Sequence, residues 1–184
     1  FLDTTVTCLN CSMMQEIAEY PLILIYLMLW HHSLTGDKAY LKKNYDFAAS
    51  LLDCYRRDYE RDGLLRDLDK WCVVEWPMEF QDGYDADIKE GKVCATPHCV
   101  INAYYLRAVL TVNRMAALLG QPPYRDAESL KETFLAAFYD PKRKLFTDSL
   151  HSSHSSYVSN AFCFGLGLAP DACAEEALLE HLES

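Results

Sequence analysis

A repeated pattern in the sequence limits the folds that this chain can adopt. Three times, a strongly apolar segment is followed by a short break and then by a segment whose apolar residues recur every three or four positions. Apolar residues at this spacing lie on one face of an α-helix, so each amphipathic segment predicts a helix with one exposed face. Each repeat is therefore predicted to be a helical hairpin, and little β-structure is expected.

The breaks between paired helices contain residues that end or begin helices. The first hairpin is predicted over about residues 20–60, with Gly36 ending its apolar helix and Asp37 as the N-cap of its amphipathic helix. The second is predicted at about 98–138 and the third at about 157–183. The first apolar helix has no polar face, which is typical of a helix enclosed by other helices.

Residues 1–184 are expected to form one incomplete domain. The chain has 184 residues, of which 51% are hydrophobic, enough to bury one core. A solenoid of stacked hairpins normally has polar capping repeats, whereas the first helix here is among the most apolar segments. The sequence therefore predicts an all-α fold in which the hairpins form about half of an (α/α)6 barrel, a closed ring of six hairpins. Because the chain begins with Phe1, it is expected to be a piece of a longer protein.

Charge and hydrophobicity argue against two classes of partner. Seventeen Lys and Arg against 27 Asp and Glu give a net charge of -10, so nucleic acid is not expected to bind. The longest apolar run, residues 20–30, is much shorter than the about 20 residues of a membrane-spanning helix. No membrane association is expected either.

Two long segments, 62–97 and 139–156, join the hairpins. Ordered joins of this length are often functional. The first of these joins has carboxylates interleaved with aromatic rings. This combination binds sugars, because the apolar faces of a sugar lie on aromatic rings while carboxylates accept hydrogen bonds from its hydroxyl groups. The candidate sugar-binding residues there are Glu75, Trp76, Asp82, Tyr84 and Asp85, and His154 of the second join could add an imidazole.

Structural alternatives remain open for the same residues. Trp76 could cover the apolar end of a helix, and Asp82 could start a turn with Gly83. A calcium site made of Asp82, Asp85 and Asp87 lacks the spacing of an EF-hand.

The eight cysteines are not arranged as a disulfide framework, because most lie within predicted helices. A reducing, cytoplasmic location is therefore expected. Cys8 and Cys11 have the spacing of metal ligands, and Cys94, His98 and Cys99 could complete a zinc site, although the second spacing is wrong for known zinc motifs. Buried thiols are the commoner use of such residues, so neither a metal nor a cofactor is predicted.

Several motifs occur together in a fixed order along almost the whole chain. They are residues 16–20, 34–37, 73–77, 81–85, 102–108, 118–120, 154–156, 160–162 and 165–170. Together they resemble the (α/α)6-barrel catalytic domain of bacterial alpha-L-rhamnosidases.

The resemblance implies an inverting glycoside hydrolase that removes terminal alpha-L-rhamnose with two carboxylates about 6.5–9.5 Å apart. It also implies that the general acid and the general base lie before and after this chain. The chain is then expected to have no catalytic residue of its own, to be inactive alone, and to have two partners: a rhamnose-containing glycoside and the missing parts of the barrel. Tyr20, in the first motif, joins the candidate substrate-binding residues.

The sequence departs from the family pattern at three places. Glu75 stands where Asp is usual, Gln81 stands where Arg is usual, and residues 158–160 replace a His-Ala-Asn triplet. The substrate could therefore differ from rhamnose. The alternative function is a non-catalytic helical scaffold that binds a carbohydrate or a protein.

Overall fold

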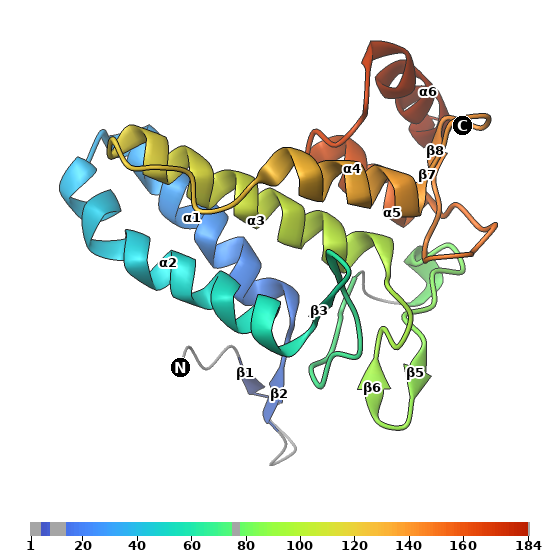
Figure 1. The fold of residues 1–184 in the computed structure, drawn as a ribbon. Coiled ribbons are helices and arrows are strands. Elements are labelled where there is room, and N and C mark those ends of the chain that lie inside the picture. Colours follow the sequence, from blue (N-terminus) through green and yellow to red (C-terminus); the bar gives the residue numbers. More distant parts are fainter. Residues whose placement is uncertain (1–4, 8–13, 75–77, 184) are drawn as a thin grey trace.

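The computed structural model describes residues 5–7, 14–74 and 78–183, and α-helices dominate this part of the chain (Figure 1). The predicted all-α fold of helical hairpins is confirmed. The helices are α1 (Glu19–Thr35), α2 (Lys38–Asp58), α3 (Cys99–Leu118), α4 (Ala127–Phe138), α5 (Tyr157–Gly165) and α6 (Ala172–Glu183).

Strands are short and form only two-stranded antiparallel sheets within the described ranges. The pairs are β1 (Thr5–Thr7) with β2 (Met14–Glu16), β3 (Glu60–Arg61) with β4 (Leu64–Leu65), β5 (Ile88–Lys89) with β6 (Lys92–Val93), and β7 (Tyr139–Asp140) with β8 (Leu145–Phe146). One short 3-10 helix, η1 (Met78–Phe80), lies in the first long join. These hairpins shape the joins between helices, and Leu64, Leu65 and Phe146 of their strands pack into the helical core.

The turns between paired helices have the chemistry that the sequence predicts. Gly36 has a φ of 70°, which a glycine adopts without strain, and its N–H donates to the carbonyl of His32. The Asp37 carboxylate then accepts a hydrogen bond from the Tyr40 amide at 2.9 Å, which caps α2. Local side-chain chemistry therefore sets where α1 ends and α2 begins.

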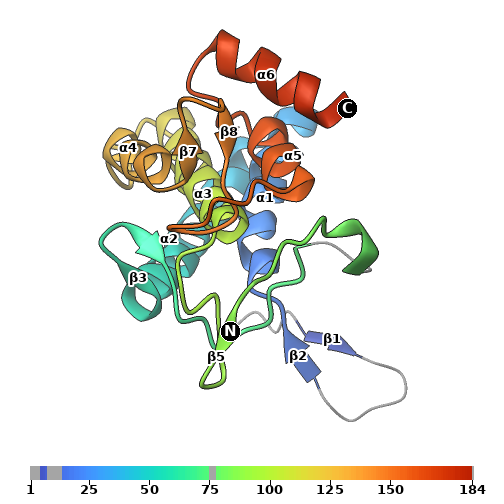
Figure 2. The same ribbon diagram turned by 90° about the vertical axis from the view of Figure 1, so that its right-hand side faces the viewer.

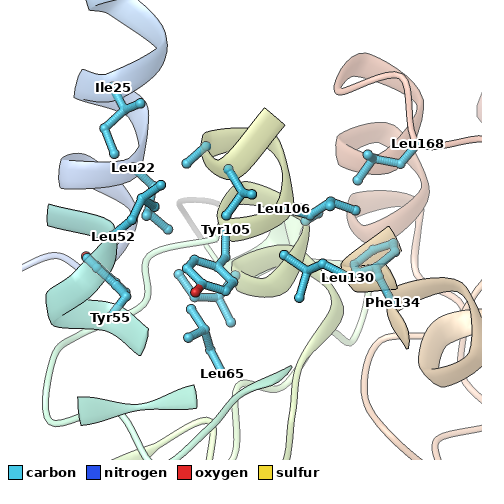
Figure 3. Close-up of a cluster of buried hydrophobic side chains, with 14 of the residues drawn as sticks. Leu22, Ile25, Leu52, Tyr55, Leu65, Tyr105, Leu106, Leu130, Phe134 and Leu168 are labelled. Atoms are coloured by element: carbon cyan, nitrogen blue, oxygen red, sulfur yellow. The ribbon is translucent and has the colours of Figure 1, made fainter. Parts of the chain in front are cut away.

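α3 is the central helix of the fold, in contact with α1, α2, α4 and α5. Figure 3 shows side chains of α1, α2 and α4 around α3, together with Leu65 of β4 and Leu168, which follows α5. Each large apolar side chain that is fully buried stabilises the fold by about 1.5–3 kcal/mol. The buried side chains labelled there are Leu22, Ile25, Leu52, Tyr55, Leu65, Tyr105, Leu106, Leu130, Phe134 and Leu168.

The first apolar helix is covered by other helices on one side only within this chain, which agrees with its predicted place at the open edge of an incomplete ring. α1 packs against α2 and α3, but Tyr26, Leu27, Trp30 and Leu34 remain exposed, with Trp30 52% and Leu34 71% accessible. A hydrophobic pattern shows which surfaces a helix can bury, and here the chain covers only one side of the helix. Within the described residues, no helix combines the length and the hydrophobicity needed to cross a bilayer.

Candidate functional site

Two asparagines hold the joins against the N-terminal ends of α3 and α5. Asn102 of α3 exchanges two hydrogen bonds with the backbone of Leu65, and Asn160 of α5 exchanges two with Phe146. Each asparagine also donates to the carbonyl four residues earlier, and both are buried. α3 and α5 therefore hold the β3–β4 and β7–β8 hairpins in the same way.

An open cavity of about 400 Å³ lies where the two long joins meet, beside the starts of α3 and α5. The joins are tied together there, because the Cys99 amide donates to the Asp148 carbonyl and the Leu150 amide donates to the Pro97 carbonyl. The cavity is lined by Gly83, Asp85, Asp87, Thr96, His98, Asp148, Ser149, Leu150, His151, Ser152 and His154.

Asp148 organises one wall of this cavity. Its Oδ1 atom accepts hydrogen bonds from the Ser156 amide, the Ser156 hydroxyl and the Ser159 hydroxyl, at 2.6–2.9 Å. Its Oδ2 atom accepts from Nδ1 of His154 at 2.6 Å, since a carboxylate can only accept. A neutral His154 then carries its free lone pair on Nε2, and its half-exposed ring lines the cavity.

A second carboxylate and imidazole pair lines the same cavity. Nε2 of His98 donates to Oδ1 of Asp87 at 2.7 Å, and the His98 side chain is 3% exposed. Tyr84 packs edge-on against this imidazole, and burial raises the pKa of its phenol above the ordinary value of 10.0. Among the described residues, neither the Tyr84 hydroxyl nor Nδ1 of His98 has a hydrogen-bond partner.

Glu19 is a buried acid in the first turn of α1, with 4% exposure. Burial raises the pKa of this carboxyl from 4.5 to about 7, although hydrogen bonds to backbone amides, including those of Val74 and Val73, oppose the rise. The Val74 amide donates to its Oε1 atom at 3.4 Å. Glu19 therefore anchors the start of the segment that leads towards residues 75–77.

The predicted site residues have different positions in the fold. Asp85 and His154 both line the cavity. Asp82 lies close by, where its Oδ2 atom accepts from the first amide of α5, that of Tyr157, at 2.7 Å. Tyr84 is 4% exposed and packs against His98, which lines the cavity. Tyr20 is 47% exposed in the first turn of α1, outside the cavity lining.

Glu75 and Trp76 lie outside the described residues, so their predicted roles stay predictions. No Trp, Tyr or Phe lines the cavity within the described part of the chain. Its chemistry is that of carboxylates, imidazoles and hydroxyls, groups that bind sugar hydroxyls directionally.

Asp148 is not among the site residues that the sequence predicts. The signal available was a carboxylate followed by several hydroxyl residues just before an apolar helix. The sequence indicates Asp87 both as a carboxylate of the aromatic join and as a candidate calcium ligand, and it indicates His98 as a candidate zinc ligand. In the described ranges, no three His, Cys, Asp or Glu side chains form a group that could hold a metal ion. Cys8 and Cys11 of the zinc alternative lie outside the described residues, so that alternative is not tested.

Comparison with solved structures defines the class of fold. The chain aligns with a family GH78 rhamnosidase of Bacillus sp. GL1 (TM-score 0.72, 19% identity, 92% of this chain and 18% of that one). It also aligns with a Klebsiella oxytoca rhamnosidase with rhamnose bound (TM-score 0.67, 16% identity, 100% of this chain and 33% of that one). A third match is the Streptomyces avermitilis alpha-L-rhamnosidase complexed with L-rhamnose (TM-score 0.60, 15% identity, 90% of this chain and 14% of that one). The fold is that of part of a glycosidase built from helical hairpins.

The family is shown by the sequence itself. The model of the bacterial alpha-L-rhamnosidase six-hairpin glycosidase domain matches residues 12–184, and this chain belongs to that family. The chain spans a third or less of each solved structure named above. No curated protein matches the chain.

Proposed function

We propose that this chain supplies one sugar-binding wall of the catalytic domain of an inverting alpha-L-rhamnosidase. The observation that carries the proposal is the cavity beside the N-termini of α3 and α5, where Asp85 and His154 meet two further carboxylates. The two long joins that precede α3 and α5 contribute this wall. The substrate proposed is a terminal alpha-L-rhamnoside.

The wall is suited to binding sugar hydroxyls. Asp85 is exposed to the cavity and can accept a hydroxyl proton, while Nε2 of a neutral His154 offers a second acceptor in a fixed direction. Asp148 holds the His154 ring, so little rotamer freedom is lost when a sugar binds. Tyr20, Glu75, Trp76, Asp82 and Tyr84 complete the proposed substrate-binding set.

We also propose that catalysis requires parts of the barrel beyond this chain. Inversion needs an acid and a base on opposite faces of the sugar. Asp87 and Asp148 are already paired with His98 and His154, and both pairs belong to the same wall. The purified chain is therefore expected to show no hydrolysis of an aryl rhamnoside. Turnover that Glu75→Gln abolishes would mean that a catalytic carboxylate lies within it.

The sugar-binding role is tested in the parent enzyme. His154→Ala and Asp85→Asn are each expected to lower kcat/KM for an aryl rhamnoside by about 10- to 100-fold, the effect of losing one hydrogen bond to the sugar. His32→Ala and Asp46→Asn, at positions outside the cavity lining, are matched controls and should leave kcat/KM unchanged. Unchanged activity in both cavity variants would refute the proposed wall. Sugar binding without turnover by the intact parent would instead support the non-catalytic scaffold.

The cytoplasm is the proposed location, since the described cysteines are all free thiols. Thiol titration of the denatured, non-reduced protein should find most cysteines reduced. Extensive oxidation of protein freshly isolated from its source would contradict this location.

A further inference from the structure

Lys144 and Cys173 make an unusually close contact away from the cavity. Lys144 lies in the turn between β7 and β8, and Cys173 lies in the first turn of α6. Their Nζ and Sγ atoms are 2.7 Å apart. Nitrogen and oxygen in an N–H···O hydrogen bond are about 2.7–3.2 Å apart, and sulfur is larger than oxygen, so this contact is short. Figure 2 shows α6 beside the β7–β8 hairpin.

The surroundings of Cys173 are those that oxidation-prone cysteines share: exposure, a neighbouring ammonium group and a helix N-terminus. Cys72, Cys94, Cys99 and Cys163 are all buried. Their contacts are thiol to thiol, at 3.7 Å for Cys72 with Cys94 and 3.5 Å for Cys99 with Cys163.

The chain offers an internal comparison. Cys54 is also exposed, but its basic neighbour is Arg57 rather than a lysine. A guanidinium stays protonated, whereas a lysine amine can lose its proton and become a nucleophile. Of these two exposed thiols, only Cys173 therefore has a nucleophilic nitrogen at contact distance.

We propose that Lys144 and Cys173 form a covalent modification site, at which peroxide joins the two side chains through an N–S bond. Hydrogen peroxide first oxidises the thiol to a sulfenic acid: the O–O bond breaks, an S–O bond forms and one water leaves. The neutral lysine amine then attacks the sulfur, forming the N–S bond and breaking the S–O bond, and a second water leaves with one amine proton. One thiol, one amine and one peroxide give one sulfenamide and two waters, with the sulfur oxidised and the peroxide reduced by two electrons.

The geometry favours the second step. Reacting atoms in productive ground-state complexes lie about 3–3.5 Å apart, and Nζ and Sγ are already closer than that. A lysine amine is almost fully protonated near neutral pH, so the neutral amine is scarce there and the reaction is faster in alkaline solution. The bond would attach α6 to the β7–β8 hairpin across 29 positions of the sequence.

Peptide mapping by mass spectrometry tests this modification site on the purified 184-residue chain. The chain is treated with hydrogen peroxide in mildly alkaline solution, digested without reductant and searched for a peptide pair joined through Lys144 and Cys173. The expected product is about 2 Da lighter than the two separate peptides and is released by dithiothreitol. A linked product about 14 Da heavier than the separate peptides would hold an oxygen atom between the nitrogen and the sulfur, and it would overturn the direct N–S bond.

Two variants separate the crosslink from ordinary oxidation. Lys144→Arg retains the positive charge but lacks the nucleophilic amine, and in it Cys173 should gain only oxygen atoms. Cys54→Ser, a matched change at the other exposed thiol, should leave the crosslink yield unchanged. The proposal is overturned if the wild-type chain yields no linked peptide. It is also overturned if Cys173 forms only sulfinic acid or disulfides, and forms them to the same extent in the wild-type chain and in Lys144→Arg.

Discussion

The buried carboxyl of Glu19 is predicted to make the stability of the chain depend on pH. Its pKa lies at about 7 in the folded state against an ordinary value of 4.5, because burial disfavours the charged form. The folded state thus keeps the proton to a higher pH than the unfolded state does. The free energy of unfolding must therefore fall as pH rises from 4.5 to about 7, and this contribution levels off above that.

The size of the effect follows from the shift. Each pKa unit is worth about 1.4 kcal/mol, so ionising Glu19 in the folded chain costs about 3 kcal/mol at pH values above 7. Glu19→Gln keeps the shape and an acceptor for the Val74 amide but never becomes charged. We expect the variant to equal the wild type near pH 4.5 and to exceed its free energy of unfolding by up to about 3 kcal/mol at pH 8.

Urea denaturation followed by circular dichroism, at a series of pH values from 4.5 to 8, measures this difference. Glu176→Gln, at an exposed position of α6, is the matched control and should follow the wild type at every pH. A constant difference between Glu19→Gln and the wild type across the series would refute the argument, because a packing change does not titrate. A variant less stable than the wild type at pH 8 would show that the buried carboxylate is stabilised by partners stronger than those described.

Three further predictions concern the fold. Asp148→Asn should lower the free energy of unfolding in a urea titration by about 2–4 kcal/mol, because the charged acceptor of four hydrogen bonds is lost. Asp85→Asn, at an exposed position, should change this free energy by less than about 0.5 kcal/mol. Arg125→Lys should cost about 1–2 kcal/mol by thermal or urea denaturation, since lysine cannot reproduce the two-point contact with the Glu60 carboxylate. The isolated chain should self-associate in sedimentation velocity, because the exposed apolar face of α1 drives the association. Trp30→Glu should shift the chain towards monomer, and a monomeric wild-type chain would contradict this prediction.

Local features of the sequence determine the helices. Helical periodicity, Gly36 and Asp37 depend on neighbours within a few positions, so the helical hairpins and the first turn could be read directly from the chain. The long joins also indicated where the polar residues gather, which is why Asp85 and His154 were selected. Motif order then indicated the family, and the family model matches residues 12–184.

The tertiary structure decides what those local signals leave open. Asp148 becomes the organising carboxylate only because the second long join folds back on the start of α5. This fold brings two serine hydroxyls and an imidazole to one side chain. Tyr84 is aromatic in the sequence whether its ring is exposed or buried, and packing against His98 places it inside. The apolar residues of α1 likewise have the same pattern whether or not a neighbour covers them. Pairing, burial and pKa depend on residues far apart in the chain, so they are properties of the folded arrangement and not of any short segment.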